Sequence, residues 1–437
     1  MPASTSDVLR VAVIADSDTR WKWGALTARR LSVGDTRLSG FLLRGRATPT
    51  PRQLAEVGAG VEEAAVQEVT GAEFLRAVER DGYDVIVLAL VGGAVQAMLH
   101  GLAALTAPAR RPVVVTGYVG VVYEKLADGL LLRHGADVVL ANSLHDAERF
   151  RAVYEGVGAD ASVVTGAALP FLGGAPYTGD TVKTVVFAAQ PSVPASREGR
   201  HYLLRRLVEH ARLHPGREVL LKLRSKPGEH TTHIEELPYQ RLAERLPGGL
   251  PGNFRLVYGH MGEVLDRTDL LVTVSSTAAL ESLHRRIPTA VLTDLGIREA
   301  LGNHHFLGSG CLASWDQLDS GLRPRADPAW LARQGVAAGG PSSGGGAYDT
   351  AFDAVRERVA RLLLDPRLPP ITPYYTLTTA PGYLPGILAR YRLDAAPAAE
   401  TGAVRRVVRD AVRDVARGAY RHGVQRVAPV IRRMGEL

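Results

Sequence analysis

Hydroxyl groups end one apolar run of the sequence, in the stretch LVTVSSTAALESL. A short β-branched run stops at Ser275, Ser276 and Thr277, and a helical pattern that contains Glu281 follows. At the carboxyl end of a parallel strand, hydroxyls and the free amides of the next helix can bind a phosphate. Glu281 would then be placed to accept hydrogen bonds from a ribose or base. A serine or threonine that only caps a helix gives the same pattern, so both interpretations stay open.

Cations follow a second apolar run, in the stretch LLKLRSKPGEHTTH. Lys222, Arg224 and Lys226 alternate where the predicted strand leaves its sheet, and a period of two places them on one side. Three cations at a strand end suit a pyrophosphate or a sugar carboxylate; a solvated edge followed by a turn is the alternative. His230 and His233 come next without a positioned carboxylate, so we expect no metal site there.

Carboxylates follow the first predicted strand, in VIADSDTRWKWG. Asp16 and Asp18 end this strand, and Lys22 belongs to the helix that begins there. A carboxylate at a strand end above a cleft is a candidate general base that deprotonates an acceptor hydroxyl. An aspartate that caps the helix is the alternative, and we expect at least one of the two to do so.

The rim of the same cleft is expected to include two glycines, a tyrosine and a glutamate. Gly92 and Gly93 follow the run DVIVLALV, where they let the backbone approach a ligand closely or only turn the chain. Tyr118 and Glu124 lie in TGYVGVVYEK. The tyrosine could stack on a sugar or pack against its own domain, and the sequence leaves both open.

The elements that must position these residues alternate along the chain, with short β-branched runs separated by helical patterns. Strands without polar alternation are buried on both faces, which predicts parallel sheets covered by helices. The stretch PFLGGAPYTGD interrupts the pattern, which restarts at TVKTVVFAAQ. We therefore predict an α/β fold with two Rossmann-like domains facing across a cleft, plus a basic C-terminal helix.

The predicted boundaries follow from these interruptions. They are residues 1–170 for the N-terminal Rossmann-like domain, 171–183 for a linker, 184–395 for the C-terminal Rossmann-like domain and 401–437 for a basic amphipathic tail. In the tail Arg405, Arg409, Arg413, Arg417 and Arg421 recur every four residues beside a valine-rich face. This pattern is typical of helices on anionic membrane surfaces, and packing on the body or a partner is the alternative.

Charge and motifs narrow the function classes. The tail's nine arginines, against Asp410, Asp414 and Glu436, account for +6 of the net charge of +7 and leave about +1 for the first 400 residues. This disfavours a body that binds nucleic acid. The chain has no GxxxxGK[ST] motif and no GxGxxG after the first strand, which disfavours a P-loop NTPase or an ordinary dehydrogenase, and we expect no cofactor.

Cysteine content and the N-terminal sequence bear on the compartment. One cysteine rules out an intramolecular disulfide and a cysteine-rich zinc site. The first residues, MPASTSDVLR, lack the pattern of a signal peptide. We expect a cytoplasmic protein, with possible attachment to the inner face of the cell membrane through the tail.

Taken together, these stretches resemble GT-B glycosyltransferases, in which the donor nucleotide lies on the C-terminal domain and the acceptor on the N-terminal one. DLLVTVSSTAALE resembles the serine-pair motif of bacterial sialyltransferase-like and Kdo-transferase-like enzymes. ADSDTRWKWGAL, TGYVGVVYEK, KLRSKPGEHTTHIEELPY and VTVSSTAALE are similar to an actinobacterial family of glycosyltransferase-like proteins of unknown function. The resemblance covers about Leu9 to Arg390 and leaves out the tail.

The resemblance implies a metal-independent transfer of a sugar from a nucleotide-sugar, with a CMP-linked acidic sugar favoured, to a cell-surface glycan or glycopolymer. Ser275, Ser276 and Thr277 would contact the donor phosphate. The histidine-proline pair of sialyltransferase-like enzymes is absent from KLRSKPGE, so CDP-linked polyols and UDP-sugars remain open. The alternatives are a nucleotide-sugar epimerase or hydrolase, a CDP-polyol phosphotransferase, and a non-catalytic scaffold with the same fold.

Overall fold

The structure is a computed structural model of the 437-residue chain. It describes residues 8–31, 34–56, 66–105, 111–121, 125–226, 229, 235, 237–336 and 346–393. The predicted basic tail, residues 401–437, lies outside the described residues, as do Glu124, His230 and His233. Within the described part of the chain, the helices are too short or too polar to cross a membrane.

The first domain is built on a parallel sheet of seven strands with the order β3-β2-β1-β4-β5-β6-β7. The central strands are buried on both faces, which their continuous Val, Ile and Ala runs predicted. The strands are β1 (Leu9–Ala15), β2 (Thr36–Leu43), β3 (Val66–Val69), β4 (Val85–Ala89), β5 (Val113–Gly117), β6 (Val138–Ala141) and β7 (Val164–Gly166).

Helices cover both faces of this sheet. Phe74, Met98 and Phe150 from three helices pack on one face, while Trp21 and Trp23 of α1 pack on the other. Sequence features set where the helices begin; for example, α1 begins after a serine whose side chain accepts a hydrogen bond from the backbone of Arg20. The helices are α1 (Asp18–Arg30), α2 (Pro51–Ala55), α3 (Gly71–Asp81), α4 (Gly92–Ala103), α5 (Leu126–Leu131) and α6 (Leu144–Gly156).

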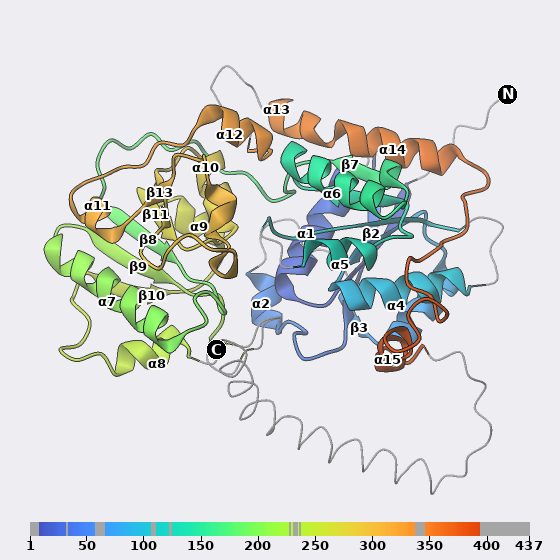
Figure 1. The fold of residues 1–437 in the computed structure, drawn as a ribbon, viewed down its shortest axis with the longest axis horizontal. Helices are drawn as coiled ribbons and strands as arrows, with labels where there is room; N and C mark the ends of the chain where they lie inside the picture. The colour runs from blue at the N-terminus through green and yellow to red at the C-terminus, as the bar shows by residue number, and fades with distance from the viewer. Residues whose placement is uncertain are drawn as a thin grey trace, which may run out of the picture. The chain divides into compact units, whose positions relative to one another are not determined.

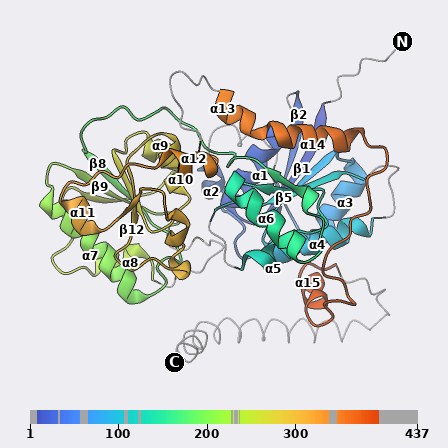
Figure 2. The same ribbon diagram turned by 45° about the horizontal axis from the view of Figure 1, so that its top comes forward.

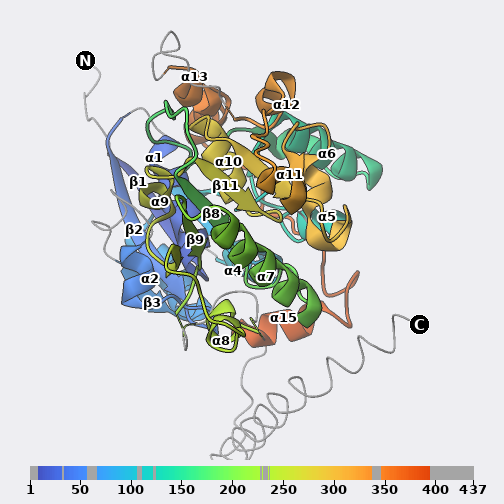
Figure 3. The same ribbon diagram turned by 90° about the vertical axis from the view of Figure 1, so that its left-hand side faces the viewer.

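The second domain has a parallel sheet of six strands with the order β10-β9-β8-β11-β12-β13. Helices α7, α8 and α11 pack on one face, and α9 and α10 on the other; α7 lies along β8 and β9 (Figure 3). The strands are β8 (Thr184–Ala188), β9 (Glu218–Lys222), β10 (Phe254–Val257), β11 (Leu270–Thr273), β12 (Thr289–Leu292) and β13 (Leu312–Ala313). The helices are α7 (Arg197–Leu213), α8 (Tyr239–Glu244), α9 (Met261–Leu265), α10 (Ala278–His284), α11 (Trp315–Asp319) and α12 (Pro328–Arg333).

The prediction of two Rossmann-like α/β domains is confirmed (Figure 1). In each sheet the strand order reverses beside the first strand, β1 in one domain and β8 in the other. Ligands of open parallel sheets bind at the carboxyl ends of the strands next to this reversal. Short 3-10 turns complete the connections, at Ala161–Val163, Glu299–Leu301, Asn303–Phe306 and Thr350–Phe352.

The end of the described chain differs from the predicted boundary of 184–395 for the second domain. Helices α13 (Gly346–Asp349), α14 (Asp353–Leu364) and α15 (Leu384–Arg390) return to the first domain (Figure 2). Val355 and Val359 of α14 join the core beneath α1, and Leu384 and Ile387 of α15 join the core beside α4. The physical reason is burial: α14 packs on β5, β6 and β7, whereas α1, on the same side of the sheet, packs mainly on β1, β2 and β4.

Candidate functional site

A cleft of about 1040 Å³ opens between the carboxyl ends of the two sheets. Its wall in the first domain comes from the residues that follow β1, β4 and β5. Its wall in the second domain comes from the residues that follow β8, β9, β10 and β11. The cleft therefore lies where the strand order of both sheets reverses, which is the expected place for a ligand.

The hydroxyl stretch after β11 lines this cleft, with its three members in different roles. The Oγ of Ser275 donates to the backbone oxygen of Leu301 at 2.6 Å, and the side chain is almost fully buried. The Oγ of Ser276 accepts from the backbone N–H of Ala278, the first residue of α10, at 3.2 Å. Thr277 is the N-cap residue of α10, and its side chain makes no capping bond. Ser275 therefore shapes the loop, while Ser276 and Thr277 present hydroxyls at the cleft.

Gln190 was not predicted from the sequence, although it fixes this stretch. Its Oε1 accepts from the backbone N–H of Ser275 at 3.0 Å, and its Nε2 donates to the Oγ of the same serine at 3.1 Å. Gln190 follows β8, the strand that pairs with β11, and it also lines the cleft. A glutamine after a buried strand was the only sequence signal, and it did not reveal the partner 85 residues away.

Two of the three predicted cations line the cleft. Lys222, at the end of β9, is 9% exposed, and its Nζ donates to the backbone oxygen of Leu223 at 2.8 Å. Burial lowers the pKa of Lys222 to about 8, although the nearby Glu56 carboxylate raises it. Arg224 lines the cleft as well, whereas Lys226 is exposed, is not among the lining residues, and has its Nζ 5.8 Å from the ring centre of Tyr258.

Asp18 and Arg224 meet across the cleft in an ion pair that the sequence did not predict. Arg224 donates to both carboxylate oxygens of Asp18, with Nε at 3.3 Å from Oδ2. Burial alone would raise the pKa of Asp18, but the Arg224 guanidinium and the Thr19 backbone hold it below its usual value. Asp18 is therefore ionised at neutral pH and has its charge matched by a residue of the other domain.

Asp16 has a local role. Its Oδ1 accepts from Arg20 at 2.9 Å, and its Oδ2 accepts from the backbone N–H of Val91 at 3.0 Å. These bonds tie the end of β1 to the turn after β4. Asp16 is not among the lining residues of the cleft, so Asp18 is the better placed of the two predicted carboxylates.

Lys22 and Glu281 form a second pair between the two domains. The Nζ of Lys22 lies 3.5 Å from Oε2 of Glu281 and 4.7 Å from the ring centre of Phe171. Both charged side chains line the cleft and are mostly buried. The two residues, which the sequence assigned to separate walls, are thus direct partners.

Of the rim residues predicted for the first domain, Gly92 and Tyr118 line the cleft, and Gly93 does not. A side chain at Gly92 would meet Leu132, and one at Gly93 would lie 3.5 Å from Ile387 of α15. The Tyr118 ring packs under Arg133, whose guanidinium carbon is 4.0 Å from the ring centre, so its main contact is within its own domain.

Further cleft residues were missed by sequence reasoning. The buried Arg133 donates from Nε to the backbone oxygen of Gly117 at 3.0 Å, which holds the end of β5. His260 follows β10, and burial together with the nearby Lys22 lowers its pKa, so it is neutral at pH 7. Tyr375 and Tyr383 enter the cleft from the segment that returns to the first domain. The position of His260 after a strand could have identified it as a cleft residue from the sequence. Tyr375 and Tyr383 come after a helix and not after a strand, so the sequence contained no such indication for them.

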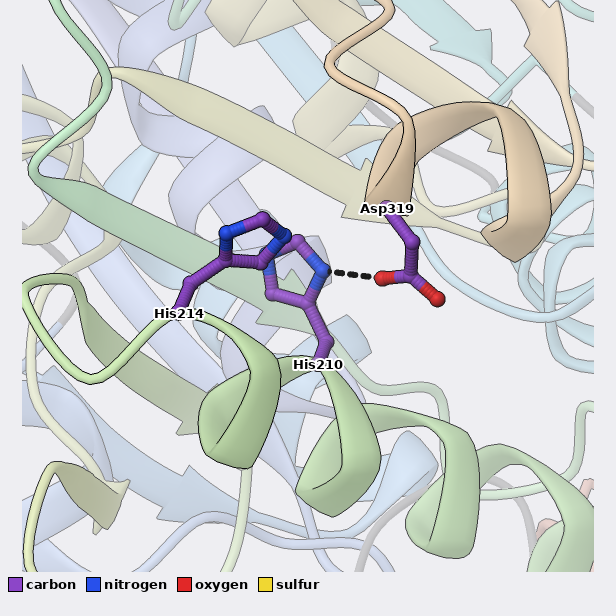
Figure 4. A group of neighbouring side chains, drawn as sticks. All are labelled: His210, His214 and Asp319. Atoms are coloured by element: carbon purple, nitrogen blue, oxygen red, sulfur yellow. Dashed lines mark hydrogen bonds and ion pairs between the residues drawn. The ribbon is translucent and has the colours of Figure 1, made fainter.

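A separate cluster of His210, His214 and Asp319 has its candidate ligand atoms within 4.8 Å of one another (Figure 4). It joins α7 to α11, and its members are not among the residues that line the cleft. The Nδ1 of His210 lies 2.6 Å from Oδ1 of Asp319, Arg206 donates to Oδ2 at 2.9 Å, and Arg217 lies 3.4 Å from Nε2 of His210. Two guanidinium groups already occupy these atoms and repel a cation, so we interpret the cluster as a tie between helices.

The fold defines a two-domain α/β protein whose Rossmann-like domains enclose a cleft with paired charged side chains. Residues 11–350 match the model of the family described as "Putative glycosyltransferase (DUF6716)". The chain belongs to this family. A search of curated proteins finds no match to the sequence.

Several solved structures are similar in fold. UDP-GlcNAc 2-epimerase from Neisseria meningitidis shares 10% identity over 81% of this chain and 100% of its own, with a TM-score of 0.49. A UDP-N-acetylglucosamine 2-epimerase described as putative, from Listeria monocytogenes, shares 10% over 82% and 95%, with a TM-score of 0.49. The spinosyn rhamnosyltransferase SpnG shares 13% over 81% and 97%, with a TM-score of 0.41. Similarities this distant carry no conclusion about chemistry.

Proposed function

We propose that the protein is a GT-B-type glycosyltransferase that moves a sugar from a nucleotide-sugar donor to a glycan acceptor. The observation that carries this proposal is the Asp18–Arg224 pair in the cleft. One domain contributes a carboxylate suited to activate a hydroxyl, and the other contributes a cation suited to a phosphate. Family membership supports the same reaction class.

The donor half is assigned to the second domain. Arg224 and Lys222 would neutralise the charge that develops on the departing nucleotide phosphate, and the hydroxyls of Ser276 and Thr277 would donate to its oxygens. With seven residues, α10 is too short for its dipole to carry a phosphate site, so the assignment depends on these side chains. Glu281 would accept hydrogen bonds from the ribose or base. A CMP-linked acidic sugar is the favoured donor because the same cations would also pair with a sugar carboxylate.

The acceptor half is assigned to the first domain, with Asp18 as the general base. Asp18 would take the proton of an acceptor hydroxyl while that oxygen attacks the anomeric carbon. The bond from the anomeric carbon to the phosphate oxygen breaks, and the nucleotide leaves with the electron pair. Asp18 can take this role only after Arg224 leaves it, and a donor phosphate is the group that would draw Arg224 away.

The acceptor we propose is a cell-surface glycan or glycopolymer. The basic sequence of residues 401–437 supports a location at the inner face of the cell membrane, because arginine-rich segments are attracted to anionic lipids. We also propose that residues 1–170 together with 346–393 form the acceptor domain and residues 184–336 the donor domain, since the described helices of the last segment pack on the first sheet.

The test is a thermal melt of the purified protein with CMP, CDP, UDP, GDP and ADP in turn. A nucleotide at about 100 times its dissociation constant adds about 2.7 kcal/mol to the free energy of unfolding. A shift with a single nucleotide identifies the donor class and selects the nucleotide-sugars for turnover assays. Turnover that needs an added glycan supports transfer, whereas turnover without one indicates an epimerase or hydrolase, and transfer of a polyol phosphate from a CDP-polyol indicates a phosphotransferase. No shift with any nucleotide favours a scaffold.

A further inference from the structure

Two tyrosines extend the first-domain wall of the cleft. Tyr375 and Tyr383 are lining residues contributed by the segment between α14 and α15 and by the residue before α15. Their ring centres are 5.9 Å apart with an angle of 68° between the ring planes. Tyr383 is 48% exposed, so much of the side chain of this large aromatic residue faces the open cleft.

Contacts with the first domain fix the backbone of the segment that carries the two tyrosines. The backbone oxygen of Tyr375 accepts from Nε2 of Gln96 at 3.2 Å and lies 2.9 Å from Nε2 of His100, both on α4. Leu384, the residue after Tyr383, is fully buried in the core of the first domain. These contacts fix the backbone that carries both rings, and a tyrosine side chain has few rotatable bonds, so binding a ligand costs little conformational entropy.

Two charged residues of the cleft, Asp128 and Lys125, belong to the same wall as the two rings. Burial raises the pKa of Tyr375, and the Asp128 carboxylate raises it further, which places this carboxylate within electrostatic reach of the ring. Asp128 in the first turn of α5 and Lys125 at its N-cap are exposed and line the cleft. A lipid or protein partner would require a wider apolar surface than two rings with charged neighbours.

We propose that Tyr375 and Tyr383 form a stacking site for a neutral pyranose unit of the acceptor. The site rests on the proposed function and names the acceptor class as an oligosaccharide or polysaccharide. The C–H groups on one face of a pyranose carry partial positive charge and pack on the negative face of an aromatic ring. The hydroxyls at the ring edge would donate to Asp128 and accept from Lys125, since hydrogen bonds to charged groups are the stronger ones.

The location of the site determines what it does. Both tyrosines belong to the wall that carries Asp18, opposite the donor residues of the second domain. A sugar stacked there would hold an acceptor chain on the side of the general base. The tyrosines would thus select acceptors with at least one pyranose besides the reacting unit.

The experiment is saturation-transfer NMR of the full-length protein with cello-, chito-, manno- and galacto-oligosaccharides. We expect saturation on the C–H protons of one pyranose face for at least one of these sugars. Tyr383→Ala should weaken that binding at least tenfold, and Tyr383→Phe should retain it because the ring stays. Leu377→Ala is the matched control, since Leu377 is exposed on the same segment and does not line the cleft.

Two outcomes would overturn the site: no saturation with any of the four sugar series, or equal saturation in wild type and Tyr383→Ala. Nucleotide-induced melting shifts, measured on the same samples, separate this site from the proposed reaction. If a sugar binds at the tyrosines but no nucleotide shifts the melting temperature, the tyrosine site is supported and the proposed transferase function is rejected. If a nucleotide shifts the melting temperature but no sugar binds, the transferase function is supported and the tyrosine site is rejected.

Discussion

Replacing Asp18 with asparagine should strengthen the binding of a nucleotide and abolish transfer. In the structure, Arg224 is bound to Asp18, so an anionic ligand must compete with that carboxylate for the same guanidinium. Asparagine keeps an oxygen for the backbone N–H of Thr19, which now donates to Asp18 at 2.7 Å, but it removes the charge. The substitution therefore releases Arg224 without disturbing the start of α1.

The expected gain in nucleotide affinity depends on how exposed the Asp18–Arg224 ion pair is to solvent. A hydrogen bond to a charged group contributes about 1.5–3 kcal/mol when it is well shielded. The side chains of Arg224 and Asp18 are 27% and 16% exposed, and solvent screening reduces the value to about 1 kcal/mol. A change of this size corresponds to about fivefold in the dissociation constant. Because the pKa of Asp18 is lowered, the pair persists through neutral pH, and the gain should be the same at pH 6 and pH 8.

The assay is calorimetric titration of wild type and Asp18→Asn with CMP, CDP and UDP, followed by transfer measurements with the matching nucleotide-sugar. Asp128→Asn is the control for a general loss of negative charge, since Asp128 lines the cleft in the first domain, whereas the carboxylate paired with Arg224 is that of Asp18. Arg224→Gln should weaken binding. Unchanged or weaker binding in Asp18→Asn, or an equal gain in Asp128→Asn, would refute the competition between carboxylate and phosphate.

Three further predictions concern stability and the remaining groups. Lys222 has its pKa lowered from 10.5 to about 8, so between those values the folded protein has lost a proton that the unfolded chain retains, and the free energy of unfolding rises with pH. Lys222→Met should remove the rise of the free energy of unfolding with pH and stabilise the protein at pH 7 by at most about 3 kcal/mol. The measurement is urea unfolding from pH 7 to 10. If the free energy of unfolding depends on pH in the same way in Lys222→Met as in wild type, the burial argument is wrong. Gly135 has φ +105°, and a Cβ there would lie 3.1 Å from the nitrogen of Pro373, so Gly135→Ala should cost about 1–3 kcal/mol and reduce oligosaccharide binding while nucleotide binding persists. Zinc should leave the melting temperature unchanged, and a rise that disappears in His214→Ala would show that His210, His214 and Asp319 hold a metal after all.

Much of the fold was predictable because strand burial leaves a direct mark on the sequence. Runs such as that of β4 are apolar at every position, and the apolar runs named from the sequence are the strands β1, β4, β8, β9 and β11. Strands β3 and β13 lack this mark, because β3 is partly exposed and β13 has only two residues. The destination of α14 could not be predicted, since an amphipathic helix shows which of its faces is buried but not which sheet covers that face.

The sequence predicted which residues lie at the strand ends of the candidate site, but it did not predict which of them bind one another. Asp18, Lys22, Arg224 and Glu281 each follow a buried strand, which placed them at the cleft, and their assigned roles stay predictions. Asp18 and Arg224 are 206 residues apart in the chain, and no local pattern encodes a bond between two domains. The same limit applies to Ser275, whose hydroxyl donates a hydrogen bond to the backbone oxygen of Leu301, 26 residues further along the chain.

On the proposed function, ion pairs between the domains would make donor binding an exchange of partners. Asp18 with Arg224, Lys22 with Glu281 and Arg52 with Glu229 each join the first domain to the second. In the first two pairs, groups proposed to bind the donor are already neutralised, so a donor phosphate must displace a carboxylate before it gains Arg224. The displaced Asp18 carboxylate would then be the ionised group that activates the acceptor hydroxyl. This coupling would let donor binding precede activation of the acceptor, because the base is held by its partner until the phosphate arrives.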